Sequence, residues 1–247
     1  GIDTYGRSLF SVFMFQQLTL MMAVPPLLAL GAPGTLLLRA VPHSGAGRPV
    51  LRLALFGLRS PFGRALVHPA LTVPLFLLSF YGFYLGDLDD AVLQHPAGHT
   101  AAQVVFLVSG LIFTVPLIAA DPLPRGHGYL TRLIDLFLEM ALHAFFGVIV
   151  MISARPLVAV FASPPEGWGI DPISDQKIAG ALAWSYGEFP TVVMLLFLLS
   201  KWFRDDTRRA RAADVHADRY GYQELDDYNA YLDKLSRRDA PPEKETQ

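Results

Sequence analysis

Apolar residues in this 247-residue chain gather into five long stretches that polar loops separate. A helix that crosses a bilayer needs roughly 20 mostly apolar residues, and each stretch is long enough. Polar and apolar residues do not alternate with a period of two over these lengths, which argues against strands. The pattern predicts an all-α polytopic membrane helix bundle with about five transmembrane helices, at about 8–31, 67–86, 101–120, 133–152 and 178–203.

Prolines lie inside four of the predicted spans, at Pro25–Pro26, Pro74, Pro116 and Pro190. A proline that would break a soluble helix is tolerated in a membrane, because neighbouring helices can satisfy the freed carbonyl group. We therefore expect kinks at these positions rather than helix ends.

The loops between the spans differ in charge. Loop 32–66 carries five arginines and no acid, loop 87–100 carries three aspartates and no Lys or Arg, and segment 201–211 carries five basic residues. An excess of Lys and Arg marks the cytoplasmic side of a membrane protein. Five spans then place Gly1 outside and Gln247 in the cytoplasm. Arginine outnumbers lysine 16 to four, which favours a GC-rich bacterial source and hence a bacterial plasma membrane.

Arg48, Arg52 and Arg59 recur at helical spacing in loop 32–66. This spacing predicts a short interfacial helix that lies on the membrane surface with its arginines toward anionic headgroups. Gly57 and Pro61 fit an irregular basic loop equally well, so both interpretations stay open here.

The C-terminal segment is polar and predicts a soluble helical tail. We divide the chain into a transmembrane domain, 1–203, and a cytoplasmic tail, 204–247. Segment 208–218 is predicted to be helical, 220–222 to be a break, and Pro241–Pro242 to follow the last helix. That last helix, 224–238, carries an apolar stripe that we expect to dock on the cytoplasmic face or on a partner. The stripe consists of Leu225, Tyr228, Tyr231, Leu232 and Leu235.

Composition narrows the function classes. Hydrophobic residues make up 52% of the chain, charged residues 17%, and the mean hydropathy is +0.36. A net charge of −2 argues against nucleic-acid binding. The absence of cysteine excludes disulfides and thiolate chemistry, so a metal would need imidazole, carboxylate, amide or thioether ligands. The chain begins without Met or a signal peptide, so we expect sequence upstream of Gly1.

Ionisable side chains inside an apolar span are costly to bury and are functional candidates for that reason. Glu139 and His143 lie one helical turn apart in the fourth span. Counted at 1.5 Å per residue from the outer end of each span, Gln17, Gln103, His143 and Glu188 lie roughly 5–15 Å deep. We expect these four residues and Glu139 to form one intramembrane polar site.

Structural roles stay open for the same residues. Gln17 and Gln103 are also typical of interhelical hydrogen bonds. A lone membrane histidine such as His143 serves equally well as a structural donor or as a ligand or proton carrier. The sequence holds no G-x-S-x-G, no H-E-x-x-H and no phosphate loop, so we expect no enzyme activity.

Several characteristic segments follow one another along almost the whole chain. They are LMMAVPPLLALGAP (20–33), HPALTVPLFLLSFYGFYL (68–85), DP (121–122), LHAFFGV (142–148), DQKIAGALAWSYGEFPT (175–191) and YNAYL (228–232). In these segments the chain resembles the CtaG family of bacterial cytochrome c oxidase assembly factors, membrane proteins implicated in delivering copper to the oxidase. The resemblance implies oxidase or other respiratory-chain subunits as partners and copper as the candidate metal.

The chain departs from the family pattern at the positions that the resemblance implies as copper ligands. Two family histidines of the first span fall on Phe13 and Gln17, and the family's histidine pattern in the third span reads His99, Gln103 and Val105 here. Phenylalanine and valine are no ligands, and glutamine is a poor copper ligand. Among histidines at these depths, His99 and His143 stay as metal candidates.

The resemblance and the departures together favour an assembly factor or accessory subunit of cytochrome c oxidase. It would bind oxidase subunits, with its copper-handling role weakened or lost. The alternative is a copper-binding or copper-transfer membrane protein, in which His143, His99 and methionines would hold the metal. A third interpretation is an intramembrane enzyme or proton pathway built on Asp135, Glu139, His143 and Glu188.

Overall fold

The computed structural model of the chain describes residues 1–42, 44–45, 47–86, 88–118, 128–220 and 223–239. Within the helices, it leaves undescribed the side chains of residues 54, 55, 57–59, 219–220, 223–225 and 237–239. The described residues form helices and no strand, as predicted. The chain divides into two compact units, Gly1–Leu199 and Ser200–Gln247.

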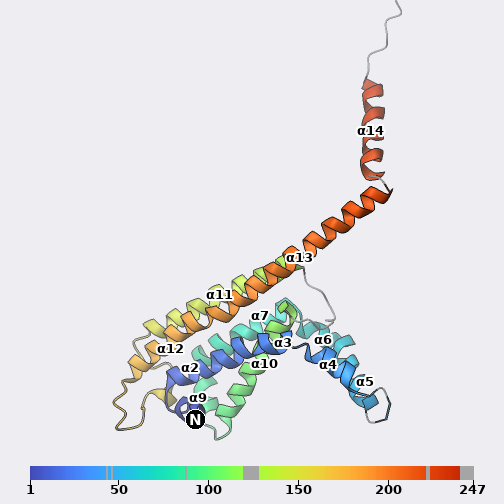
Figure 1. Cartoon of the computed structure of the whole chain (residues 1–247). Helices are drawn as coiled ribbons and strands as arrows, with labels where there is room; N and C mark the ends of the chain where they lie inside the picture. Colours follow the sequence, from blue (N-terminus) through green and yellow to red (C-terminus); the bar gives the residue numbers. More distant parts are fainter. Residues whose placement is uncertain (43, 46, 87, 119–127, 221–222, 240–247) are drawn as a thin grey trace, which may run out of the picture. The chain divides into compact units, whose positions relative to one another are not determined.

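Five apolar helical segments make up the first unit (Figure 1). In chain order they are α2–η1–α3 (Phe10–Leu18, Thr19–Ala23, Val24–Leu30), α7–η2–α8 (Pro69–Leu77, Leu78–Gly82, Phe83–Leu85), α10 (Gly98–Ile118), α11 (Tyr129–Ile152) and α12–α13 (Pro172–Tyr186, Glu188–Tyr220). The last of these helices, α13, continues into the second unit.

Four of these segments are long and apolar enough to cross a membrane, which is consistent with the prediction of about five spans. The α7–η2–α8 segment is shorter because Pro69 fixes its start and Gly86 follows its end. Its 17 residues extend about 26 Å at 1.5 Å per residue, near the short end of the range for membrane helices.

Two of the predicted proline sites coincide with wide helical turns. The π-helical turn η1 ends two residues before Pro25, and η2 begins four residues after Pro74. Proline removes a backbone donor and clashes with the preceding turn, and the π-helical turn η1 accommodates Pro25–Pro26 in this way. Because η2 follows Pro74, this explanation does not extend to it. Pro116 lies within an unbroken α10, and Pro190 lies in the first turn of α13.

The helix neighbours form a closed ring. Helix α12 packs between α11 and α2, the α2–η1–α3 segment packs on α10, and α7 contacts both α10 and α11. Two glycines permit the close approach of α11 and α12: a Cβ atom on Gly147 would lie 2.6 Å from the backbone nitrogen of Trp184, and one on Gly180 would lie 2.5 Å from that of Met151. Buried aromatic rings, among them Phe13, Phe80 and Phe146, fill the interior.

Short helices occupy the loops. They are α1 (Ile2–Gly6), α4 (Pro33–Ala40), α5 (Gly47–Arg59), α6 (Pro61–Leu66), α9 (Leu88–Leu93) and the 3-10 turn η3 (Ala159–Phe161). Helix α5 confirms the helix predicted from the arginine spacing, and Arg48 and Arg52 are exposed on it. The side chain of Arg59 lies outside the described part of the structure.

The second unit is helical, as the sequence predicted. The polar end of α13 runs to Tyr220, and α14 (Gln223–Asp239) carries the predicted apolar stripe. Four members of this stripe, Tyr228, Tyr231, Leu232 and Leu235, are exposed within the unit. Of the break predicted at 220–222, Tyr220 is still part of helix α13. Residues 221–222, the Pro241–Pro242 pair and the Asp121–Pro122 pair lie outside the described residues.

The contact between α11 and α12 predicts that the loss of stability on replacing a glycine by alanine depends strongly on where that glycine lies. Gly147→Ala should lower the stability of the folded chain by about 1–3 kcal/mol, because its methyl group meets backbone that cannot move aside. Gly128→Ala is the matched control, since its methyl group would meet no atom within 4 Å. Thermal unfolding of the detergent-solubilised variants measures the difference, and equal unfolding temperatures would contradict the close packing.

Candidate functional site

The most deeply buried ionisable pair is Glu139 and His143 on α11, with 1% and 0% of their surfaces exposed. Their spacing of four residues places both on one face of the helix, toward the bundle interior. The imidazole of His143 lies 4.7 Å from the ring of Phe80 on η2, centre to centre. The hydroxyl group of Thr191 on α13 lies 3.4 Å from Glu139 Oε2, within hydrogen-bonding distance.

Gly187 makes room for this histidine. It is the single residue that separates α12 from α13, and a Cβ atom at this position would overlap the ring of His143. Glu188 follows directly and lies near enough to interact electrostatically with Glu139. The junction of α12 and α13 therefore brings a second carboxyl group, that of Glu188, near Glu139 and His143 on α11.

This cluster contains several buried polar atoms with no hydrogen-bond partner among the described residues. They are both ring nitrogens of His143, Glu139 Oε1 and Glu188 Oε1. Such atoms are rare because each one has lost its hydration without gaining a hydrogen bond, and this makes the cluster the candidate functional site. An imidazole and two carboxyl groups in apolar surroundings can hold a proton or pass it on.

Gln17 belongs to a different group, on the interior face of α2. The hydroxyl group of Tyr84 donates a hydrogen bond to Gln17 Oε1, and Gln17 Nε2 donates to the backbone oxygen of Ser79 at 3.4 Å. The hydroxyl group of Ser79 in turn donates to that of Ser109 at 2.8 Å. The amide thus ties α2 to the α7–η2–α8 segment, which is linked to α10.

Gln103 and His99 form a third group at the start of α10. Gln103 donates a hydrogen bond of 3.1 Å to Asp3, and His99 Nε2 lies 3.0 Å from the backbone oxygen of Gly6. The hydrogen bond from Gln103, followed by that from Arg7, holds the pKa of the Asp3 carboxyl below its usual range. These contacts attach the N-terminal helix α1 to the bundle.

The hydrogen bonds of the described residues therefore divide the predicted polar layer into three groups. Glu139, His143 and Glu188 come together, while Gln17 and Gln103 each have partners elsewhere. The sequence analysis did not anticipate these partners, Tyr84 and Asp3, because they lie far away in the chain and carry no local signal.

The positions that the resemblance implies as copper ligands do not fit a copper centre. Phe13 is fully buried and its ring centre lies 4.8 Å from that of His99, so an aromatic contact occupies the first of these positions. Gln17 is hydrogen-bonded as described above, and Val105 is more than half exposed. Copper in a cysteine-free protein needs two to four converging imidazole or thioether donors. In the described part of the chain, no three His, Cys, Asp or Glu side chains cluster closely enough to hold a metal ion.

Two polar residues of α12 also carry structural roles that the sequence analysis missed. Asp175 accepts hydrogen bonds from the backbone nitrogens of Phe10, at 2.6 Å, and Ser11, at 3.3 Å, and from the Ser11 hydroxyl group. It thereby caps α2 from a neighbouring helix. Gln176 accepts from Leu157 N at 2.7 Å and donates to two backbone carbonyls of the same loop. The sequence signal that could have indicated these roles is a pair of polar residues just inside the start of an apolar helix.

Comparison of the sequence with known proteins shows which family the chain resembles over most of its length. The family model of the cytochrome c oxidase caa3 assembly factor matches residues 1–205. Uncharacterized proteins of Mycobacterium bovis and Mycobacterium tuberculosis are each 39% identical to it over 241 residues, and one of Mycobacterium leprae is 40% identical. These alignments cover 96% of the chain but only 36–37% of the relatives, so the chain spans about a third of their length. No solved structure matches it significantly.

The contact between Gly187 and His143 predicts a strong coupling between the two positions. Gly187→Ala should lower the free energy of unfolding by about 1–3 kcal/mol, because the new methyl group overlaps the imidazole. His143→Ala removes that ring, so the double variant should lose less stability than the two single losses added together. Denaturant unfolding of the four proteins measures this difference. Simple additivity would show that Gly187 is not there to accommodate His143.

Proposed function

The chain belongs to the cytochrome c oxidase caa3 assembly factor family, CtaG, and on this basis we propose that it serves the oxidase by binding oxidase subunits within the membrane. It acts as an assembly factor or accessory subunit rather than as an enzyme. Its copper-handling role is weakened or lost.

The observation that carries this proposal is the packing at the implied ligand positions. Phe13 is enclosed by the rings of His99, Phe106 and Phe161, with centres 4.8–6.0 Å away. Gln17 is hydrogen-bonded to Tyr84, and Gln103 is hydrogen-bonded to Asp3. Hydrophobic packing and amide hydrogen bonds thus stabilise the bundle at the places where a copper carrier would need free donors. The helical scaffold can present surfaces to a partner without the metal.

Two exposed apolar surfaces support a role in binding partners. On the outer faces of α11 and α13, Phe145, Ile152 and Phe189 have 64–70% of their surfaces exposed. These faces suit lipid and the transmembrane helices of another subunit. In the second unit, the α14 stripe around Tyr231 and Leu232 suits a soluble part of a partner.

We assign the two parts of the chain to different compartments. Residues 1–203 form the domain embedded in the bacterial plasma membrane, and residues 204–247 form the cytoplasmic tail. The arginines of loop 32–66 and the basic residues of 201–211 support this orientation, with Gly1 outside. The intramembrane cluster of Glu139, His143 and Glu188 lies within the embedded domain and supplies a proton site during assembly.

The partner-binding role predicts that oxidase subunits co-purify with the chain. In a mild detergent, the tagged full chain should retain oxidase subunits. Tyr231→Ala with Leu232→Ala should reduce their yield at least about tenfold, because losing two large apolar contacts, each contributing roughly 1.5–3 kcal/mol when fully buried, exceeds the roughly 1.4 kcal/mol that a tenfold change in affinity requires. Asp227→Ala with Asn229→Ala, on the same helix but outside the stripe, is the matched control. Quantitative mass spectrometry of the eluates measures the yield. Absence of oxidase subunits from the wild-type eluate would contradict the proposal.

The weakened copper role predicts that the purified chain binds no stoichiometric copper. Cu(I) titration against a chromophoric chelator, followed by metal analysis, should give well under one equivalent, because no three His, Cys, Asp or Glu side chains in the described part of the chain cluster closely enough to hold a metal ion. His143→Ala should leave this value unchanged. One tightly bound copper per chain, lost in His143→Ala, would instead establish a copper-transfer protein.

A further inference from the structure

A pocket of about 390 Å³ lies where the N-terminal helix α1 packs against the α2–η1 segment and α10. One part of its lining is polar, with a carboxylate, two amides and a hydroxyl group, and the other part is apolar. The proposed oxidase function leaves this pocket unused. The polar residues are Asp3, Gln16, Thr19 and Gln103, and the apolar ones are Ile2, Phe15 and Leu20.

The pocket runs from the membrane surface into the hydrocarbon layer. Asp3 belongs to α1, which precedes the apolar segment, whereas Leu20 lies ten residues after Phe10, roughly 15 Å along that segment. On α1, the ring of Tyr5 lies 5.6 Å from that of Trp168, centre to centre, and both side chains are about half exposed. Such aromatic side chains gather at the level of the lipid headgroups. A ligand that fills the pocket therefore needs a polar head and an apolar chain.

Asp3 supplies a negative charge that a ligand can reach, because its side chain is 54% exposed. Its Oδ1 atom accepts a hydrogen bond of 3.1 Å from Gln103, and Oδ2 accepts one of 3.3 Å from Arg7. His99 Nδ1, at 3.8 Å from Oδ1, is too far away for a hydrogen bond. A carboxylate has about four acceptor positions, so each oxygen of Asp3 can accept one further hydrogen bond. The head of the ligand should therefore carry a cationic donor.

Arg7 places a positive charge directly beside this carboxylate. It lies four residues after Asp3, pairs with it through Nε, and has a side chain that is 48% exposed. The guanidinium group has further N–H donors in a planar fork that matches the oxygens of a phosphate group. Two neighbouring charges of opposite sign match a zwitterionic head, in which an ammonium group and a phosphate group are joined by a short linker.

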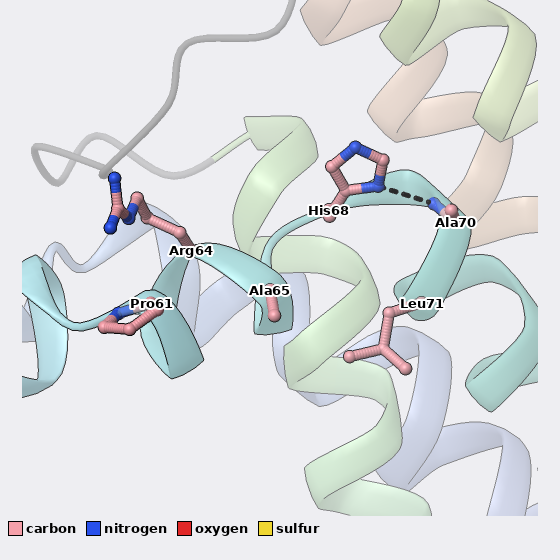
Figure 2. A pocket seen from close by; sticks show the side chains of 6 residues that line it. All are labelled: Pro61, Arg64, Ala65, His68, Ala70 and Leu71. Atoms are coloured by element: carbon pink, nitrogen blue, oxygen red, sulfur yellow. Dashed lines mark hydrogen bonds between the residues drawn. The ribbon is translucent and has the colours of Figure 1, made fainter.

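The pocket at the start of α7 has a different charge (Figure 2). Arg64 lines it, together with His68, whose Nδ1 atom accepts a hydrogen bond of 3.2 Å from the backbone nitrogen of Ala70. Among the described residues, none that lines this second pocket carries a carboxyl group. The neighbouring opposite charges of Asp3 and Arg7 therefore distinguish the pocket beside α1.

We propose that the pocket beside α1 binds phosphatidylethanolamine, with the ammonium group donating to Asp3, the phosphate group accepting from Arg7 and one acyl chain lying along Phe15 and Leu20. A bound lipid joins α1 to α2 and α10, the elements that line the pocket. The proposal rests on the membrane embedding of residues 1–203. It is independent of the partner subunit, so its failure would leave the oxidase assignment standing.

Native mass spectrometry of the detergent-solubilised full chain, titrated with phosphatidylethanolamine, phosphatidylcholine or phosphatidylglycerol, tests the proposal. Phosphatidylethanolamine should occupy one stoichiometric site and bind most tightly, because the choline group has no N–H donor and phosphatidylglycerol has no cation. Asp3→Asn should weaken its binding about threefold to fivefold, the effect of one well-placed exposed ion pair, and weaken phosphatidylcholine binding by less. The asparagine oxygen can still accept the hydrogen bond from Gln103, so the variant should fold. Arg7→Gln should weaken the binding of both zwitterionic lipids alike, because both carry the phosphate group.

Glu166→Gln is the matched control. Glu166 is exposed two residues before Trp168, which contacts Tyr5 on α1, and it lies outside the pocket lining. This variant should change the affinity less than twofold. Losses of equal size in Asp3→Asn and Glu166→Gln would show diffuse charge attraction and overturn the site. Equal affinity for phosphatidylethanolamine and phosphatidylcholine, or displacement of the lipid by an equal concentration of phosphoethanolamine, would overturn the assignment to this lipid.

Discussion

A polar side chain in an apolar bundle must find its partner on a neighbouring helix, and this constraint organises the structure. The carboxylate of Asp175 on α12 caps the start of α2 through two backbone nitrogens and a hydroxyl group. Gln17 on α2 is held by Tyr84 and Ser79. Each such bond fixes the rotation of one helix against another, because an unpaired polar group in hydrocarbon is costly. The ring of five segments is therefore determined by polar contacts as much as by apolar area.

The same constraint explains how a family scaffold can persist after its implied ligands have changed. Phenylalanine at position 13 is fully enclosed by aromatic rings, and glutamine at position 17 retains a hydrogen-bonding amide. Both side chains fit the helix faces of their neighbours. The Glu139, His143 and Glu188 cluster is the exception, because several of its polar atoms have no partner in the described part of the chain. We propose a function in the membrane for this cluster.

The sequence predicted the elements of the fold better than their contacts. Apolar stretch length predicted about five spans, and arginine spacing predicted helix α5, because both signals are local. The partner of Gln17 lies 67 residues away, and Asp175 caps a helix 165 residues away. Such pairs depend on which helices become neighbours, which hydrophobic periodicity does not encode. The space that Gly187 leaves for His143 was hidden for the same reason.

The pairing of Gln17 with Tyr84 provides the most direct test, because it decides whether an implied ligand position has become a structural contact. The measurement is a double-mutant cycle on the free energy of unfolding with Gln17→Leu, Tyr84→Phe and the double variant. Gln17→Leu alone should lose about 1–3 kcal/mol, since it leaves the buried Tyr84 hydroxyl group unpaired. The double variant should lose clearly less than the two single losses combined. Additive losses would contradict the account and leave Gln17 available as a ligand.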